Sequence, residues 1–197
     1  MWMLVENHSE QKAALRKKLR SLQREMPKFE RDFVDAAICR SVLKLPLLQQ
    51  KNVVFCYIGV DWEINTVPLI YDLLRLKKRV VLPLCTSPGI MEAREITGAY
   101  DLVPGAYNIP EPRASCPLCP PEQIDLALIP CVSCDRQFGR LGQGGGFYDR
   151  FLENADFFTV ALCREKAMLD EVPTESWDQS VDCIVTDKNT YFRKSLN

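Results

Sequence analysis

The sequence contains very little histidine, and its apolar residues never form a long uninterrupted run. His8 is the single histidine among 197 residues. Catalytic triads with histidine, cysteine–histidine pairs and zinc sites that need histidine are therefore disfavoured. No run reaches the roughly 18 apolar residues of a membrane-spanning helix, and the opening segment lacks the basic start and apolar stretch of a signal peptide. We expect no membrane interaction and a cytoplasmic location.

The sequence also lacks an excess of charge of one sign. The 25 Lys and Arg residues are balanced by 26 Asp and Glu residues. Proteins that bind nucleic acid through a broad electropositive face carry a clear basic excess. A composition of 47% hydrophobic and 26% charged residues is typical of a globular domain rather than of a disordered or fibrous chain. We expect a single domain over residues 1–197 and a monomer without a nucleic-acid partner, although a local anion site is compatible with this charge.

Cysteine, in contrast, is abundant, with nine residues. Cys116 and Cys119, and likewise Cys131 and Cys134, have the two-residue spacing found in zinc sites. The apolar run at 124–129 predicts a strand of about 20 Å at roughly 3.3 Å per residue, which would hold the two pairs near its opposite ends. We therefore favour reduced thiols that pack as small apolar side chains over a zinc ion shared by both pairs. A disulfide framework does not suit a chain without a signal peptide.

Apolar periodicity predicts alternating helices and strands. The predicted helices cover 9–26, 29–45, 66–77 and 145–154, and the predicted strands cover 52–58, 79–84, 124–129, 157–163 and 181–186. Continuous apolar strands between amphipathic helices are typical of a parallel sheet that is covered on both faces, which is an α/β fold. The segment 86–121, rich in proline and glycine, predicts a functional loop or a small hairpin excursion.

A glycine-rich segment follows the strand predicted at 124–129. Its glycines are Gly142, Gly144, Gly145 and Gly146. In open α/β sheets, ligands bind at the carboxyl ends of the strands, where glycines let backbone N–H groups approach phosphate oxygens. Arg140 places a permanent cation beside this loop, and Asp149 lies one turn into the next helix, where a carboxylate can hold Mg²⁺. These groups are typical of a phosphoryl-transfer site. The alternative is a flexible turn before a helix whose Asp149 complements the helix dipole.

Five segments, taken together, point to a family. They are Lys12-Ala-Ala-Leu-Arg16, Glu63-Ile-Asn-Thr66, Gly105-Ala-Tyr-Asn-Ile-Pro-Glu-Pro112, Arg140-Leu-Gly-Gln-Gly-Gly-Gly-Phe-Tyr-Asp149 and Trp177-Asp-Gln-Ser-Val-Asp-Cys-Ile-Val-Thr186. In this order they resemble the 5-formyltetrahydrofolate cyclo-ligases, also called 5,10-methenyltetrahydrofolate synthetases. The fourth segment is the most specific, and the resemblance covers nearly the whole chain. It implies a three-layer α/β sandwich with N-terminal helices, related to sugar-phosphate isomerases and CoA transferases.

The resemblance implies an ATP- and Mg²⁺-dependent ring closure of a reduced folate, 5-formyltetrahydrofolate, to 5,10-methenyltetrahydrofolate. The formyl oxygen would attack the γ-phosphate of ATP, N10 would add to the activated carbon, and phosphate would leave. Positioning and charge neutralisation supply most of the catalysis in such a reaction, so histidine is not needed. Two alternatives remain: a relative with the same ATP site and another substrate, and a non-catalytic ligand-binding module on the same fold.

The resemblance also implies roles for individual residues. Arg140 and Asp149 would be catalytic, and Asp149 and Asp178 would hold Mg²⁺. The residues implied to bind ATP are Lys12, Arg16, Arg140, Leu141, Gly142, Gln143, Gly144, Gly145, Gly146, Phe147 and Tyr148. The residues implied to bind the folate are Ile58, Glu63, Tyr107, Gln143, Gly144, Gly145, Gly146 and Phe147. Without the resemblance, Lys12 and Arg16 would be read as a solvated helix face, Glu63 as a carboxylate at a helix start, and Tyr107 as a loop aromatic.

Overall fold

The computed structural model describes residues 8–193. Its helices are α1 (His8–Glu25), α2 (Lys28–Leu43), α3 (Pro46–Gln50), α4 (Val67–Arg75) and α5 (Phe147–Leu152). Its strands are β1 (Val53–Phe55), β2 (Arg79–Ser87), β3 (Ile90–Ile96), β4 (Leu102–Pro104), β5 (Pro110–Pro112), β6 (Leu126–Pro130), β7 (Ser133–Cys134), β8 (Arg140–Leu141), β9 (Phe158–Leu162), β10 (Cys183–Val185) and β11 (Thr190–Phe192). Short 3₁₀ helices occupy Ala99–Asp101, Ala106–Asn108, Pro121–Gln123 and Glu165–Ala167.

None of the described helices is long and apolar enough to cross a membrane. The interpretation of the opening segment as free of a signal peptide falls largely on residues 1–7, which lie outside the described residues.

Seven strands form one sheet in the order β11-β10-β9-β6-β1-β2-β3. The five inner strands run parallel, whereas β11 and β3 pair antiparallel with their neighbours at the two edges. In the centre, Val54 of β1 is in register with Val80 of β2 and Leu126 of β6. All three side chains are fully buried. Inner strands of this kind are apolar throughout because helices cover both faces of the sheet.

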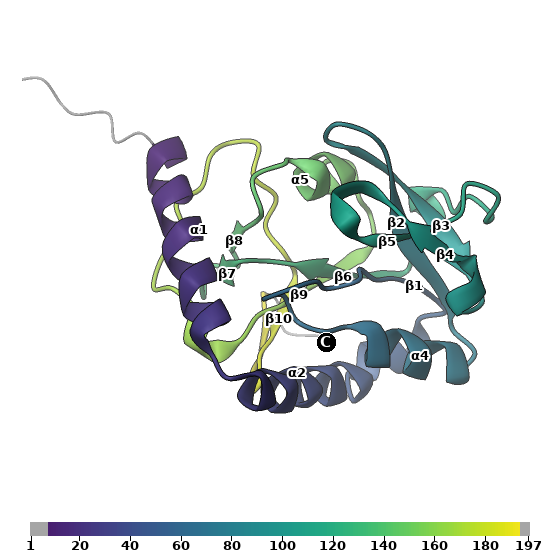
Figure 1. Ribbon diagram of the computed structural model, residues 1–197, viewed down its shortest axis with the longest axis horizontal. Coiled ribbons are helices and arrows are strands. Elements are labelled where there is room, and N and C mark those ends of the chain that lie inside the picture. Colours follow the sequence, from purple (N-terminus) through teal and green to yellow (C-terminus); the bar gives the residue numbers. More distant parts are fainter. Residues whose placement is uncertain (1–7, 194–197) are drawn as a thin grey trace, which may run out of the picture.

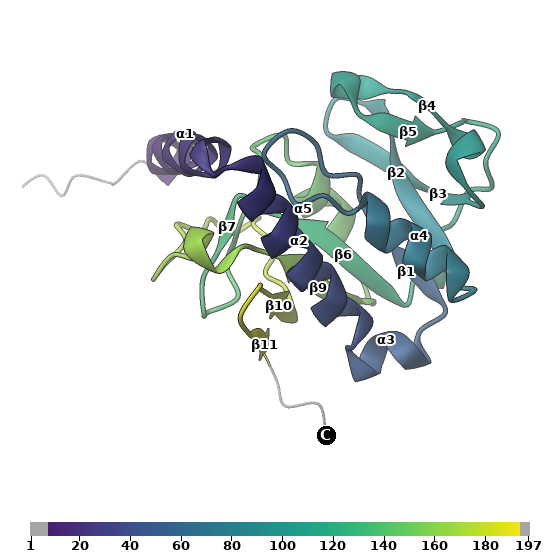
Figure 2. The ribbon, with the colours of Figure 1, turned by 60° about the horizontal axis from the view of Figure 1, so that its bottom comes forward.

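The helices lie in two layers on either side of the sheet (Figure 1; Figure 2). Ile38 of α2 and Leu69 of α4 pack against one face, in a core cluster that includes Leu128. On the other face, Phe151 of α5 packs on Phe55 of β1 with ring centroids 4.8 Å apart. The helix α1 stands beside β7 and β8 (Figure 1). The predicted α/β class, the mostly parallel sheet and the N-terminal helices are confirmed.

Several predicted boundaries are wrong for identifiable reasons. The strand predicted at 52–58 stops at Phe55, and the chain then turns back so tightly that a Cβ on Gly59 would lie 1.8 Å from the carbonyl oxygen of Ile64. The helix predicted at 29–45 ends at Leu43, and a separate short helix that was not predicted, α3, begins at Pro46, because proline suits the first position of a helix.

The segment 86–121 contains the predicted hairpin rather than an unstructured loop. The strand β2 extends to Ser87, and Gly89, with φ +76°, turns the chain into the antiparallel β3. Two further short strands, β4 and β5, pair with each other beyond this hairpin. The edge strand β11 was not predicted, because its three residues are half-buried and carry no apolar run.

The cysteines are free thiols, and members of the two spaced pairs lie in different core clusters. Cys119 packs in the cluster with Leu152 of α5, whereas Cys134 packs in a separate cluster with Cys163. A metal ion shared by both pairs does not fit this arrangement.

A buried arginine connects the sheet to the N-terminal helices. Arg164 follows β9, and its side chain is 1% exposed. Its Nε and one terminal nitrogen donate to the two carboxylate oxygens of Asp35 in α2, at 2.8 and 3.0 Å. The same guanidinium donates to Gln23 of α1 at 2.5 Å and to the carbonyl oxygens of Trp62 and Glu63 at 2.7 and 3.1 Å. All five guanidinium N–H groups are therefore used.

Arg164→Met is expected to lower the free energy of unfolding by about 3–5 kcal/mol, because it leaves the Asp35 carboxylate buried without its cation. Urea unfolding of the wild type and the variant measures this change. The control is Arg79→Met, which removes a partly exposed ion pair with Glu95 and should cost about 1 kcal/mol or less. Equal losses in the two variants would contradict the role assigned to Arg164.

Candidate active site

Two cavities meet at the glycine-rich loop beyond the carboxyl ends of the sheet strands. The apolar cavity, of about 390 Å³, is lined by Tyr57, Ile58, Val60, Trp62, Glu63, Leu82, Pro83, Cys85, Met91, Tyr107, Ile109, Pro110, Glu111, Pro130, Arg140, Gly142, Gln143, Gly144, Gly145, Gly146, Phe147, Tyr148 and Asp149. The polar cavity, of about 810 Å³, is lined by Ser9, Lys12, Arg16, Arg140, Leu141, Gly142, Gly144, Gly145, Gly146, Asp149, Arg150, Glu153, Glu175, Ser176, Trp177, Asp178 and Gln179. The segment 140–149 thus forms a wall that both cavities share.

The backbone of the loop presents unused hydrogen-bond donors. Between β8 and α5, no N–H group of residues 142–146 donates to another residue of the described range. Gly144 and Gly146 have φ of +98° and +69°, the left-handed region that favours glycine. Arg16 of α1 lies against the loop, and its Nε donates to the carbonyl oxygen of Gly142 at 2.8 Å. Free N–H groups beside a cation form a cradle suited to an anion such as phosphate.

Arg140 and Asp149 form an ion pair in the shared wall. One terminal nitrogen of Arg140 donates to Oδ1 of Asp149 at 2.6 Å, and the arginine side chain is 1% exposed. The Asp149 oxygen also accepts from the backbone N–H of Gln179 at 3.3 Å. Nε of Arg140 is buried and has no hydrogen-bond partner among the described residues. This guanidinium is held in place and keeps donor capacity for a ligand.

Cationic and anionic side chains of the polar cavity contact each other directly. Nζ of Lys12 donates to Glu175 at 2.7 Å and also to Oδ2 of Asp178. The backbone N–H of Glu175 donates to that same Asp178 oxygen at 2.7 Å. Oδ1 of Asp178 and Oδ2 of Asp149 accept no hydrogen bond from the described part of the chain. These two free carboxylate oxygens are ligands that Mg²⁺ prefers.

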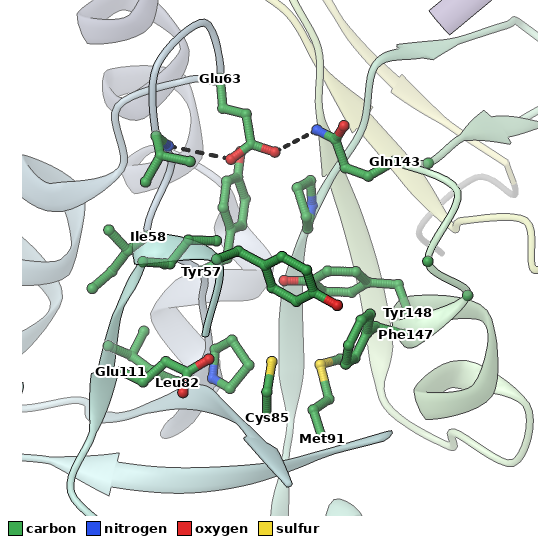
Figure 3. Close-up of a pocket in the computed structure, with 18 of the residues that line it drawn as sticks. Tyr57, Ile58, Glu63, Leu82, Cys85, Met91, Glu111, Gln143, Phe147 and Tyr148 are labelled. Carbon is green, nitrogen blue, oxygen red and sulfur yellow. Dashed lines mark hydrogen bonds between the residues drawn. The ribbon is translucent and has the colours of Figure 1, made fainter. Parts of the chain in front are cut away.

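The apolar cavity contains a carboxylate on the loop that follows β1 (Figure 3). Glu63 accepts from Nε2 of Gln143 at 2.6 Å and from the N–H of Val60 at 3.2 Å. Burial raises the pKa of Glu63. Burial also raises the pKa of Tyr57 and of Tyr148 well above the ordinary value, so both phenols are neutral at physiological pH.

The structure brings the predicted residues together from distant parts of the sequence. Lys12, Arg16 and Asp178 line the polar cavity. Ile58, Glu63 and Tyr107 line the apolar cavity, where the ring of Tyr107 lies edge-to-face with that of Phe147 at 6.1 Å. The residues of the loop divide between the two cavities. Leu141 faces the polar cavity, whereas Gln143, Phe147 and Tyr148 line the apolar cavity and not the polar one.

Sequence reasoning missed a second carboxylate in the apolar cavity. Glu111 of β5 is 7% exposed and points into this cavity beside Cys85 (Figure 3). Burial and the neighbouring Glu111 raise the pKa of Cys85 to about 12. Gly105 leaves room for the carboxylate, because a Cβ there would lie 2.5 Å from it. The available signal was a charged residue between two prolines, Pro110 and Pro112, in one of the segments that carry the family resemblance.

Comparisons with known proteins identify similar chains. The sequence model of the 5-formyltetrahydrofolate cyclo-ligase family matches residues 8–187. The 5-formyltetrahydrofolate cyclo-ligase of Escherichia coli strain K12 is 30% identical over 151 residues, which cover 74% of this chain and 83% of that protein. The Haemophilus influenzae protein of the same name is 26% identical over 178 residues, covering 87% of this chain and 95% of that protein.

A solved structure shares the fold. The NMR structure of Aquifex aeolicus 5,10-methenyltetrahydrofolate synthetase superimposes with a TM-score of 0.86 at 26% identity. The superposition covers 94% of each chain, so the similarity extends over both cavities and both layers of helices.

Gly144→Ala is expected to lower the free energy of unfolding by about 1–3 kcal/mol, because alanine is strained at this positive φ. The added Cβ would also contact the guanidinium of Arg16 at 3.4 Å, so binding of inorganic tripolyphosphate should weaken. Urea unfolding and calorimetric titration measure the two effects. The control is Gly98→Ala, where the backbone is extended and an added Cβ meets nothing within 4 Å. Unchanged tripolyphosphate binding in Gly144→Ala would argue against the loop as an anion cradle.

Proposed function

The chain belongs to the 5-formyltetrahydrofolate cyclo-ligase family, and on that premise we propose that it uses ATP and Mg²⁺ to convert 5-formyltetrahydrofolate into 5,10-methenyltetrahydrofolate, ADP and phosphate. Family membership makes it a ligase of folate metabolism. We further propose that ATP and Mg²⁺ bind in the polar cavity and that the reaction follows the steps given below.

The observation that carries the proposal is the wall shared by the two cavities. An apolar cavity of about 390 Å³ has the size of a small-molecule site and suits a pteridine ring. The polar cavity has the cations and free backbone N–H groups that suit a triphosphate. Since segment 140–149 lines both, a folate and a nucleotide bound in them would meet at Arg140. A ligand-binding module has little need for two cavities that converge on one buried ion pair.

ATP would bind with its phosphates on the glycine-rich loop. The N–H groups of residues 142–146 would donate to phosphate oxygens, and Lys12 and Arg16 would add positive charge from α1. Lys12 and Arg16 lie one helical turn apart, which puts them on the same face of that helix. Both line the polar cavity together with Arg140.

Asp149 and Asp178 would hold Mg²⁺. Each lines the polar cavity and keeps one carboxylate oxygen without a hydrogen bond to the rest of the described chain. Carboxylate oxygens together with substrate phosphates are the usual ligand set of this ion in phosphoryl-transfer sites. When bound there, Mg²⁺ neutralises phosphate charge.

The reaction joins the two substrates through the formyl oxygen. This oxygen attacks the γ-phosphorus of ATP and ADP leaves, so the formyl oxygen becomes part of a phosphate leaving group. N10 then attacks the formyl carbon, and phosphate departs with the N10 proton as the ring closes. Arg140 would stabilise the charge on the transferred phosphoryl group, since its guanidinium is buried, fixed by Asp149 and part of the lining of both cavities.

The pteridine would be recognised by carboxylates in the apolar cavity. Its ring N–H and amino groups are donors, and Glu63 and Glu111 are acceptors on opposite sides of the cavity (Figure 3). Glu63 is already held by Gln143 and Val60, whereas Glu111 accepts no hydrogen bond from a backbone N–H of the described chain. We therefore assign Glu111 the larger share of recognition. Tyr107 would stack on the folate at the open side of the cavity.

All of these groups come from one chain. The proposed reaction therefore needs no residue from a second copy, and we propose a monomer in which residues 1–197 form one domain.

The central experiment follows the near-ultraviolet absorbance of the conjugated methenyl product. We expect absorbance to rise when the protein, 5-formyltetrahydrofolate, ATP and Mg²⁺ are all present, and to stay flat when ATP or Mg²⁺ is omitted. If ATP binds in calorimetry but no product forms, the better hypothesis is that this protein keeps the ATP site of the family and acts on another substrate.

Asp149→Ala is the variant that links this activity to the site. It should lower kcat at least about 100-fold, because it removes the proposed metal ligand and the partner that orients Arg140. Asp72→Ala is the matched control, since Asp72 is a partly exposed residue of α4 that pairs with Arg75 and lines neither cavity. Full activity in Asp149→Ala would contradict the proposed roles of Asp149 in metal binding and in orienting Arg140.

Glu111→Leu is expected to raise KM for 5-formyltetrahydrofolate about 10- to 100-fold, because a donor of the pteridine loses a charged acceptor in a buried site. KM for ATP should not change, since Glu111 does not line the polar cavity. Steady-state kinetics with each substrate varied in turn separates the two constants. Glu122→Leu, at an exposed position outside both cavities, serves as the control. An unchanged KM for 5-formyltetrahydrofolate would indicate that Glu63, and not Glu111, recognises the pteridine.

A further inference from the structure

Three cysteine side chains meet outside the two cavities described above. Cys131 follows β6, Cys134 ends β7, and Cys163 follows β9. The strands β6 and β9 are adjacent and parallel, so the residues that follow them come side by side at the carboxyl end of the sheet. None of the three lines the apolar or the polar cavity. The proposed reaction gives them no role.

The sulfur atoms are arranged closely enough to share one ion. Sγ of Cys131 and Sγ of Cys134 are 3.5 Å apart, and the three Sγ atoms all lie within 4.8 Å of one another. Metal–thiolate bonds are about 2.3 Å long, which places the sulfurs of a planar three-coordinate complex roughly 4.0 Å apart. Changes of less than about 1 Å in the sulfur–sulfur distances would bring the three atoms to that spacing.

The surroundings of the cluster are apolar and provide no fourth ligand of the usual kind. Cys134 and Cys163 pack with the buried side chains of Ala161, Ala167, Val181 and Ile184. Within residues 8–193, no histidine, carboxylate or further cysteine joins the group. Zn²⁺ almost always takes four ligands in structural sites, whereas soft thiolate ligands select Cu(I). A closed set of three sulfurs therefore favours Cu(I).

A permanent cation lies next to the cluster. Cys134 is in register with Arg140 in the β7–β8 pair, and the Arg140 guanidinium donates at 3.4 Å to the carbonyl oxygen of Pro130, the residue before Cys131. Its charge lowers the pKa of Cys131 and of Cys134, although other effects dominate. A cation in this position offsets part of the negative charge that three thiolates would place in a buried site.

We propose that Cys131, Cys134 and Cys163 form a binding site for one Cu(I) ion, coordinated by three sulfur atoms. Binding exchanges thiol protons for the ion and releases them to solvent, with no change in the oxidation state of copper or sulfur. The hydrogen bond shared with Cys134, together with burial, raises the pKa of Cys131 well above its ordinary value. Because the thiols start protonated, Cu(I) should bind more tightly at higher pH.

The test uses the full chain, reduced and kept free of oxygen, titrated with Cu(I) in competition with a coloured Cu(I) chelator. We expect one equivalent per chain to be retained and the retained fraction to be larger at pH 8 than at pH 6. X-ray absorption at the copper edge should give sulfur neighbours only, about three in number. Loss of all copper to the chelator, or nitrogen and oxygen neighbours in the absorption data, would overturn the proposal.

Matched cysteine variants locate the ion. Cys131→Ala and Cys163→Ala should each weaken Cu(I) retention at least about tenfold, since each removes one of three ligands. Cys183→Ala is the control, because Cys183 is a buried thiol, like Cys163, but packs in another cluster. Cys131→Ser and Cys163→Ser keep the volume of the side chain and separate loss of a ligand from loss of packing, and thermal unfolding checks that each variant is folded. Equal copper retention in all of these variants would show that the ion binds elsewhere.

The measurement of bound copper does not depend on catalysis, so a negative ligase assay would not affect this test.

Discussion

The guanidinium of Arg164 joins four parts of the chain that are far apart in sequence. It follows β9 and uses its five N–H groups on α1, on α2 and on the loop that carries Trp62 and Glu63. Burial of a cation is costly unless every donor is satisfied, and here Asp35 also supplies the compensating charge. The positions of the α1 cations and of Glu63 therefore both depend on this one side chain. Arg164 thus helps to fix α1, which contributes to the polar cavity, relative to the loop that contributes Trp62 and Glu63 to the apolar cavity.

A second constraint is that different residues of segment 140–149 supply backbone N–H groups and charge. Glycines make the backbone approach possible at Gly144 and Gly146, while Arg140 and Asp149 supply charge from the ends of the segment. The loop is held by Arg16 and Arg20 of α1, which donate to the carbonyl oxygens of Gly142 and Gln143. Its shape is thus determined partly by a helix more than 120 residues away in sequence.

The sequence predicted the inner strands and the fold class because strands buried on both faces are apolar throughout. The edge strand β11 was not predicted, and β3 was predicted only as part of a hairpin without bounds, since most of their residues are exposed or half-buried and carry no such pattern. Most residues of the candidate site followed from the family resemblance, and local spacing alone left Lys12 as a solvated helix residue although it is 5% exposed. Glu111 was missed because no spacing relates it to the glycine loop. The approach of Cys163 to Cys131 likewise depends on strand order, which periodicity does not provide.

The wall between the two cavities has a consequence for inhibitor design. Gly142, Gly144, Gly145 and Gly146 line both cavities, and glycines have no side chains that would separate a ligand on one side from a ligand on the other. A compound that fills the apolar cavity and carries a phosphate-like group on a short tether would reach the polar cavity beside Arg140. Its second contact would form at a high effective concentration, so the affinities of two weak fragments would combine in one molecule. Selectivity would then come from the pairing of the cavities rather than from either cavity alone.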